Sequence, residues 1–189
     1  MNHLLRLRLG LRVLIILLLL GALAACGFGS ATPEQVAQTG GGSSPELVAQ
    51  NFFEDLRQAL KDQQLSNETK RDQWVERLAN YFAPIERDDQ RVALSSALEN
   101  FVSGRDKLNQ NETLTLDVRF DKIEKISEDG DRALVRPTNG SIYILITRAT
   151  NNGTFTLYED DVPLTKIVGD PNGAVPVIRI GRSWFLTEG

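Results

Sequence analysis

The residues that most often act as bases, nucleophiles or metal ligands are almost missing from this sequence. It contains one histidine, His3, and one cysteine, Cys26. After residue 26 there is therefore no Ser-His-Asp unit, no Cys-His unit and no zinc site built from Cys and His. No disulfide can form within the chain. Any chemistry must use carboxylates, tyrosine, lysine, arginine or backbone groups.

Carboxylates are thus the remaining candidates for acid–base or metal chemistry. The densest acidic run is Glu159-Asp160-Asp161. It lacks the spaced Asp/Asn and Gly pattern of a calcium loop, so we interpret it as a solvated loop. Asp117 lies in an alternating segment, where its parity sets it opposite the apolar residues Leu116 and Val118. The sequence accordingly predicts no metal, no cofactor and no catalytic residue.

Four aromatic residues are candidates for the lining of a ligand pocket: Trp74, Tyr81, Phe82 and Tyr143. The first three lie on one side of a predicted helix and could hold an apolar or amphipathic ligand by area burial. Packing in the core is the alternative, because aromatic rings dominate cores and pockets alike. A desolvated Asp or Glu beside Tyr81 or Tyr143 would instead favour a carboxylate-dependent enzyme.

Helical patterns come first along the folded part of the chain. The first helix is predicted to start at Ser44-Pro45-Glu46, because Ser44 suits the N-cap, Pro45 the first turn and Glu46 the positive end. The second covers about 69–82 and is stopped by Pro84. The third covers about 88–103 with Gly104 as its stop. The predicted inner faces are Val48, Phe52, Leu56 and Leu60 in the first helix, and Val92, Leu94, Leu98, Phe101 and Val102 in the third.

After Gly104 the apolar period changes from helical to two. Leu114, Leu116, Val118 and Phe120 alternate with polar residues. Turn sequences at 128–131, 139–140, 151–153 and 170–173 separate further strands. These strands are predicted at 133–135, 142–147, 154–158, 164–168, 175–180 and 183–186. Helices followed by strands predict an α+β domain with an antiparallel sheet.

The N-terminus has the pattern of a secretory signal. Three arginines precede an apolar run, and the charge-free stretch from Val13 to Cys26 has fourteen residues. A membrane-spanning helix needs about 20, so a permanent span is the weaker alternative. The tetrapeptide Leu23-Ala24-Ala25-Cys26 resembles the lipobox of bacterial lipoproteins. That resemblance implies a diacylglycerol on the Cys26 thiol, cleavage before Cys26, and acylation of the new amine, for example by palmitate. An ordinary signal peptide with a chance Cys is the alternative.

These features predict three parts: a lipoprotein signal peptide at 1–25, a flexible tether at 26–44 and one domain at 45–189. The Gly- and Ser-rich segment 27–44 would span roughly 24 Å as a random coil. Removing residues 1–25 takes away three arginines and no acid, which leaves 18 basic and 25 acidic residues, a net charge of −7. Such a chain repels nucleic acid. The membrane is therefore expected as a partner only through the lipid on Cys26.

The element order resembles the nuclear transport factor 2-like superfamily, including its SnoaL-like domains. The residues that carry the resemblance are the opening helix Val48-Ala49-Gln50-Asn51-Phe52-Phe53 and the closing strand Ile180-Gly181-Arg182-Ser183-Trp184-Phe185-Leu186. It implies a cone in which N-terminal helices cover the concave face of a curved antiparallel sheet, with a pocket at the wide end. Some members are isomerases or dehydratases, and many bind ligands or partners without known catalysis.

Two classes of function remain. The first is a binding or interaction module at the outer face of a bacterial membrane, for a small apolar ligand or an envelope protein. The second is a carboxylate-dependent isomerase or dehydratase-like enzyme that uses a cone pocket. The lack of His and free Cys in the folded part favours the first.

Overall fold

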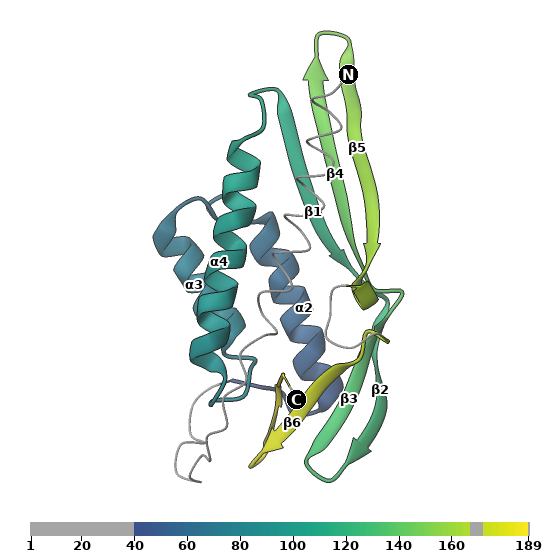
Figure 1. Ribbon diagram of the computed structural model, residues 1–189. Helices are drawn as coiled ribbons and strands as arrows, with labels where there is room; N and C mark the ends of the chain where they lie inside the picture. The colour runs from purple at the N-terminus through teal and green to yellow at the C-terminus, as the bar shows by residue number, and fades with distance from the viewer. Residues whose placement is uncertain (1–39, 167–171, 189) are drawn as a thin grey trace.

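The computed structural model describes residues 40–166 and 172–188. Within them, three helices pack against antiparallel strands, which confirms the predicted α+β class (Figure 1). The helices are α2 (Pro45–Lys61), α3 (Glu68–Ala79) and α4 (Arg87–Asp106). The strands are β1 (Glu112–Arg119), β2 (Lys122–Asp129), β3 (Arg132–Thr138), β4 (Ser141–Thr150), β5 (Gly153–Pro163), β6 (Val175–Ile180) and β7 (Ser183–Leu186).

The strands form two sheets, ordered β1-β4-β5 and β2-β3-β6-β7. The two sheets are halves of one long, bent hairpin, because the pairing of β1 with β4 continues in the same register into the pairing of β2 with β3. The break falls at Phe120-Asp121 on one strand and Asn139-Gly140 on the other. Asn139 has a φ of 50° there, and its side chain donates to Asp121 at 2.7 Å. The predicted curvature is thus concentrated at one bend.

Helix α2 lies between the sheets and the other helices (Figure 1). Its N-terminus forms as predicted: the Ser44 hydroxyl accepts from Leu47 N at 3.2 Å, with Pro45 in the first turn. Its buried surface is wider than one stripe, because both sides are covered, and Phe52 and Leu56 are only partly buried. The fully buried apolar residues of α2 are Val48, Ala49, Phe53, Ala59 and Leu60.

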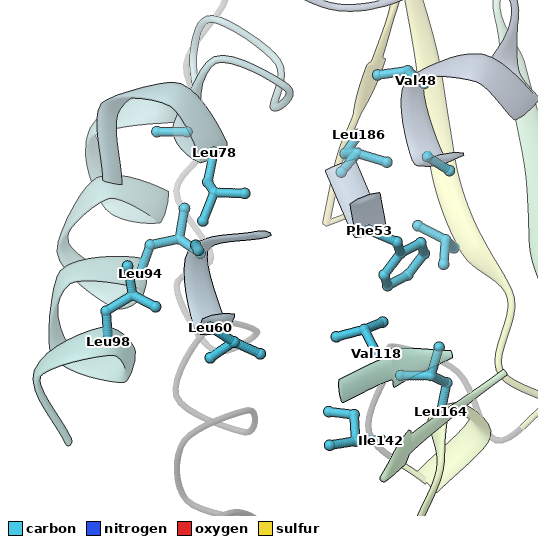
Figure 2. Packing of buried hydrophobic residues seen from close by; sticks show 14 of the residues in the cluster. Val48, Phe53, Leu60, Leu78, Leu94, Leu98, Val118, Ile142, Leu164 and Leu186 are labelled. Atoms are coloured by element: carbon cyan, nitrogen blue, oxygen red, sulfur yellow. The ribbon is translucent and has the colours of Figure 1, made fainter. Parts of the chain in front are cut away.

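Apolar side chains fill the space on both sides of α2 (Figure 2). On the helical side Leu60 faces Leu78 of α3 and Leu94 and Leu98 of α4. On the sheet side the core contains Val48, Phe53, Val118, Ile142, Leu164 and Leu186. The core is therefore continuous from α4 to the strands.

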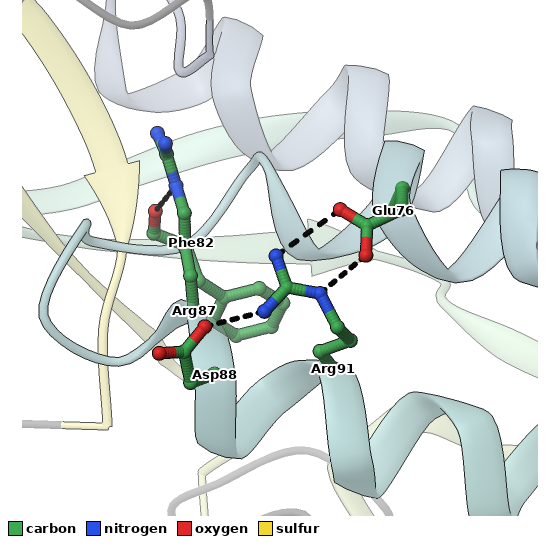
Figure 3. Close-up of polar contacts among 5 residues, drawn as sticks. All are labelled: Glu76, Phe82, Arg87, Asp88 and Arg91. Carbon is green, nitrogen blue, oxygen red and sulfur yellow. Dashed lines mark hydrogen bonds and ion pairs between the residues drawn. The ribbon is translucent and has the colours of Figure 1, made fainter.

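Arg91 joins α3 to α4 at the surface (Figure 3). Its guanidinium donates to both carboxylate oxygens of Glu76 on α3 and to Asp88, one turn earlier on α4. These hydrogen bonds, with Glu76 first, raise the pKa of Arg91. Exposed pairs of this kind stabilise little on their own, so we attribute the α3–α4 contact mainly to the buried leucines.

The predicted inner face of α4 is wrong at Val92, which is 68% exposed. At 3.6 residues per turn, Val92 lies about 200° from Leu94 around the helix. The buried positions of α4 recur every three or four residues and include Arg87 and Gln90 as well as Leu94, Leu98, Phe101 and Val102. Gly104 does not end the helix either, because α4 continues to Asp106.

Two predictions in the second half of the chain are also wrong. Glu159-Asp160-Asp161 is not a loop but part of β5, which pairs with β4 up to Pro163. This edge strand is largely exposed, so it tolerates polar residues on both faces. The predicted strand at 164–168 begins instead as a 3₁₀ turn over Leu164–Lys166. The rest of that segment, and residues 170–171 of the predicted turn at 170–173, lie outside the described residues.

The N-terminal predictions fall largely outside the described residues. These include Cys26, the signal peptide and positions 27–39 of the predicted tether. Its last residues, from Gly40, already pack on the domain, since Gly42 forms an antiparallel bridge with Trp184. Residues 40–44, assigned to the tether in the sequence-based prediction, thus include positions that pack on the domain. As for the described helices, each is too short or too polar to cross a lipid bilayer.

The packing of α4 gives a test with an internal control. Leu98→Ala should lower the free energy of unfolding by about 2–5 kcal/mol, because it leaves a cavity in the core. Val92→Ala on the same helix should change it by less than about 0.5 kcal/mol, because that side chain is exposed. Urea titrations followed by circular dichroism measure both. Equal losses for the two variants would contradict the assigned inner face.

Candidate functional site

The best-defined polar group in the helical layer surrounds Asp55. This α2 residue is 4% exposed and points toward α3. Its carboxylate accepts from Arg77 Nε at 2.5 Å, from Arg77 Nη2 at 2.7 Å and from the Tyr81 hydroxyl at 2.7 Å. Arg77 and Tyr81 stand four residues apart, so both reach the same point on α2. Three donors thus occupy one buried carboxylate.

Trp74 extends this group toward the end of α2. Its indole Nε1 donates to Asp62 Oδ2 at 2.7 Å. The hydrogen bond from Trp74, followed by one from Gln64 N, lowers the pKa of Asp62. The Arg77 guanidinium lies over the Trp74 ring, 5.4 Å from its centroid. We call Asp55, Asp62, Trp74, Arg77 and Tyr81 the α2–α3 cluster.

Phe52 contacts both Tyr81 of the α2–α3 cluster and Phe82, the third predicted pocket residue of the helical layer. Its ring packs edge to face against two others, with ring centroids 6.0 Å apart for Tyr81 and 5.4 Å apart for Phe82. Trp74, Tyr81 and Phe82 are all partly buried and packed against the core. The structure therefore brings these three predicted residues into one region.

Tyr143 lies elsewhere. Ile142, Ile144 and Ile146 of β4 are buried, so Tyr143 projects from the opposite face of the sheet. There the Arg119 guanidinium sits 3.7 Å from its ring centroid, and its hydroxyl donates to Glu159 at 2.8 Å. This hydrogen bond to Glu159 is the main cause of the raised pKa of Tyr143. Tyr143 and the helical aromatic residues thus occupy separate surfaces.

Asp117 shares the Tyr143 face, as its parity predicts, because Leu116 and Val118 on either side are buried. Its carboxylate pairs with Lys61 at 2.6 Å and with Arg119 at 3.4 Å. Burial would raise the pKa of Asp117, but these two cations outweigh it and lower that pKa. Asp117 is therefore an ionised partner in a surface network.

The two donors that bind Asp55 both keep their protons at neutral pH. Burial, and then the hydrogen bond to Asp55, raise the pKa of Tyr81 to about 12, so the phenol stays protonated at neutral pH. Hydrogen bonding to Asp55 raises the pKa of Arg77. The Arg77 side chain is still 57% exposed. A permanently charged guanidinium beside an indole is consequently presented to solvent.

Metal binding finds no support in this part of the chain. Among residues 40–166 and 172–188, no group of three or more His, Cys, Asp or Glu side chains is placed to hold a metal ion. In the acidic run of β5, Glu159 accepts from Tyr143, and Asp160 accepts from the Tyr158 hydroxyl at 2.7 Å. These acids serve local hydrogen bonds along the strand.

Asp55 is the residue of the cluster that sequence reasoning missed. Its signal was present, because it follows Phe52 by three residues and precedes Ala59 by four, the spacing of one helix face. A carboxylate at such a position needs a partner. The partner, Arg77, is 22 residues away on another helix, and no local pattern identifies it.

Comparisons with known proteins add no family: no protein-family model matches the chain, and neither a curated protein nor a solved structure matches it.

The cluster predicts an unusual tyrosine titration. The absorbance change lost in Tyr81→Phe should have its midpoint near pH 12, against an ordinary value of 10.0. The folded state favours the neutral phenol, so this contribution to stability is complete below pH 10 and is lost as the pH rises toward 12. Asp55→Asn should lower the midpoint only partly, because burial is the larger cause. A wild-type midpoint near 10 would contradict the buried contact.

Proposed function

We propose that this chain is a lipid-anchored binding or interaction module at the outer face of a bacterial membrane. The anchor is supported by Leu23-Ala24-Ala25-Cys26, placed directly after an apolar run that is short for a spanning helix. Two or three acyl chains on Cys26 would hold the protein stably, since each buried methylene contributes roughly 0.8 kcal/mol. The domain behind this anchor would face the space outside the membrane.

The observation that favours a binding function over a catalytic one is that the Asp55 carboxylate is already hydrogen-bonded. A general base needs an oxygen that is free to accept a proton from a substrate. Asp55 is the buried carboxylate nearest a tyrosine, and three donors already occupy it. The Arg77 side chain is in contrast 57% exposed, and the half-buried Trp74 ring lies beside it. The cluster is thus suited to hold a ligand with an apolar or aromatic body and a negatively charged group.

An enzyme that uses a carboxylate, such as an isomerase or a dehydratase, is the second candidate. The 2.7 Å contact between Asp55 and Tyr81 favours it, because a buried acid beside a tyrosine is a common arrangement for proton transfer. For this function Arg77 would have to release Asp55 when a substrate binds. The bidentate ion pair opposes that release, so we rank this candidate lower.

We also propose that the domain is a divergent member of the nuclear transport factor 2-like superfamily. The support is architectural: helices come first, and they pack against strands bent at Phe120-Asp121 and Asn139-Gly140. In this proposal the two sheets correspond to the single curved sheet of the family. The α2–α3 cluster would then be a feature of this chain on the helical layer.

The anchor is tested by Cys26→Ala. The wild-type chain should incorporate a labelled fatty acid and appear as a cleaved, acylated product in intact-mass spectra, whereas Cys26→Ala should lose the label and accumulate as precursor or as a different product. Because Cys26 is the single cysteine, the thiol has no substitute. Retention of Met1 on an unacylated wild-type protein would contradict the proposal.

The binding face is tested with naphthalene-2-sulfonate, which combines an aromatic body with a negative charge. Calorimetric titration of residues 40–189 should show binding that Trp74→Leu weakens at least fivefold, because the ring stacked with Arg77 is lost. Tyr143→Leu is the matched control, since it removes an aromatic ring from the other face of the sheet. Equal weakening by both variants, or no binding by the wild type, would reject this face as the ligand site.

A further inference from the structure

The composition of Gly40-Gly41-Gly42 predicts a flexible linker, but this run lies against the edge of β7. Gly42 N donates to Trp184 O, and Trp184 N donates to Gly42 O, both at 2.8 Å. Farther along the same edge, Leu186 N donates to Tyr81 O at 2.9 Å, and Ala83 N donates to Leu186 O at 2.8 Å. Two separate segments therefore cover this edge, the glycine run at Trp184 and the α3–α4 connection at Leu186.

The fit of the run depends on the absence of side chains. Gly41 has a φ of +82°, and a Cβ there would lie 2.5 Å from Trp184 O and 2.8 Å from Cε1 of Phe185. A Cβ at Gly42 would lie 2.8 Å from Val48 N. A flexible linker has no such requirement, since any small polar residue would serve there. These glycines are accordingly shaped to a specific docking position.

The docked run also covers a cation that lacks an acid partner. Arg87 is 8% exposed, and its guanidinium lies 5.7 Å from the ring centroid of Phe185. Its Nε donates to Phe82 O at 3.3 Å (Figure 3). Its Nη2 has no hydrogen-bond partner among the described residues and would lie 2.8 Å from a Cβ at Gly40. Burial, and then the charge of Arg91, lower the pKa of Arg87.

The carboxylates around Arg87 are engaged with other groups. Glu86 accepts from the Thr187 hydroxyl at 2.6 Å and from Glu188 N at 3.2 Å. Asp88 accepts from Arg91, as Figure 3 shows. Docking of the glycine run thus keeps water from a guanidinium that no carboxylate of the described residues pairs with, and this opposes docking. Glycine loses more conformational freedom on ordering than any other residue, which opposes docking further.

We propose that Gly40-Gly41-Gly42 is a releasable latch on the edge of β7. Closed, it covers Phe185, Arg87 and the backbone of Trp184. Open, it returns water to Arg87 and leaves the backbone N–H and C=O of Trp184 without their Gly42 partners. The strand itself stays in place, because β6 and the Tyr81–Ala83 segment still hold it.

The latch is tested by amide hydrogen exchange of single residues in the full chain, held in detergent micelles. The two amides to compare lie on one strand: Trp184 N, bonded to Gly42, and Leu186 N, bonded to Tyr81. Local opening predicts that Trp184 exchanges at least tenfold faster than Leu186, with little dependence on low concentrations of urea. Gly41→Ala should speed Trp184 exchange at least another tenfold and leave Leu186 unchanged.

Two further variants serve as controls. Arg87→Met should slow Trp184 exchange, because docking no longer buries an unbalanced charge. Val92→Ala, at an exposed position of α4, should change neither amide. Equal exchange of Trp184 and Leu186 in the wild type would overturn the proposal, since the run would then open only with the whole domain. This wild-type comparison decides the matter even if Gly41→Ala does not fold. Comparing the exchange of Trp184 and Leu186 in Cys26→Ala shows whether opening of the latch depends on the lipid anchor.

Discussion

The burial of α2 on two sides is the constraint on which the other features depend. One side meets the strands and the other faces α3 and α4 (Figure 2), and the exposed positions Gln50, Gln58 and Lys61 lie on the surface that remains. Asp55 is on the helical side, where an unpaired charge would be costly. Arg77 and Tyr81 satisfy it, and in doing so they fix how α3 and the turn after it pack on α2. The cluster therefore pairs a carboxylate that packing has buried, and it leaves the Arg77 guanidinium partly exposed to solvent.

The same constraint explains the shape of the strands. A flat hairpin of this length would touch α2 over only part of its own length. The bend at Asn139-Gly140 divides it, so that β1 meets α2 near Lys61 at its C-terminal end while β2, β3 and β7 also contact this helix. The pairing register is the same on both sides of the bend. The buried positions, however, change across it from even residue numbers, such as Val118 and Ile142, to odd ones, such as Ile123 and Val135, so that the apolar side chains of both halves join one core. β5 is the outer strand of the β1-β4-β5 sheet and is largely exposed, which accounts for its polar composition.

Sequence reasoning succeeded where the signal is local. Ser44-Pro45-Glu46 marks the start of α2 because these residues act on the backbone of the first turn of the same helix. The alternation in β1 predicts that Asp117 points away from the buried face of the strand. Sequence reasoning failed where the deciding contact is distant in sequence. Val92 is apolar and is therefore predicted to be buried, but α4 packs on the core through a face that does not contain Val92. Asp55 could not be paired with Arg77, and the glycine run could not be recognised as docked, because its acceptor is Trp184 at the other end of the chain. Composition alone makes three glycines look like a tether.

The C-terminal residues show why the edge of β7 can open in parts. After β7 ends, Thr187 and Glu188 bind Glu86 at the start of α4, and Gln90 donates to Glu188 at 2.5 Å. Burial raises the pKa of Glu86, and the Thr187 and Glu188 donors act against that rise. β7 is therefore held by β6 on one side, by Tyr81–Ala83 on the other and by Glu86 beyond its end. The glycine run adds one bridge at Trp184 to this arrangement. Removing one bridge leaves the strand anchored at the remaining points, so its local opening is physically separable from the unfolding of the domain.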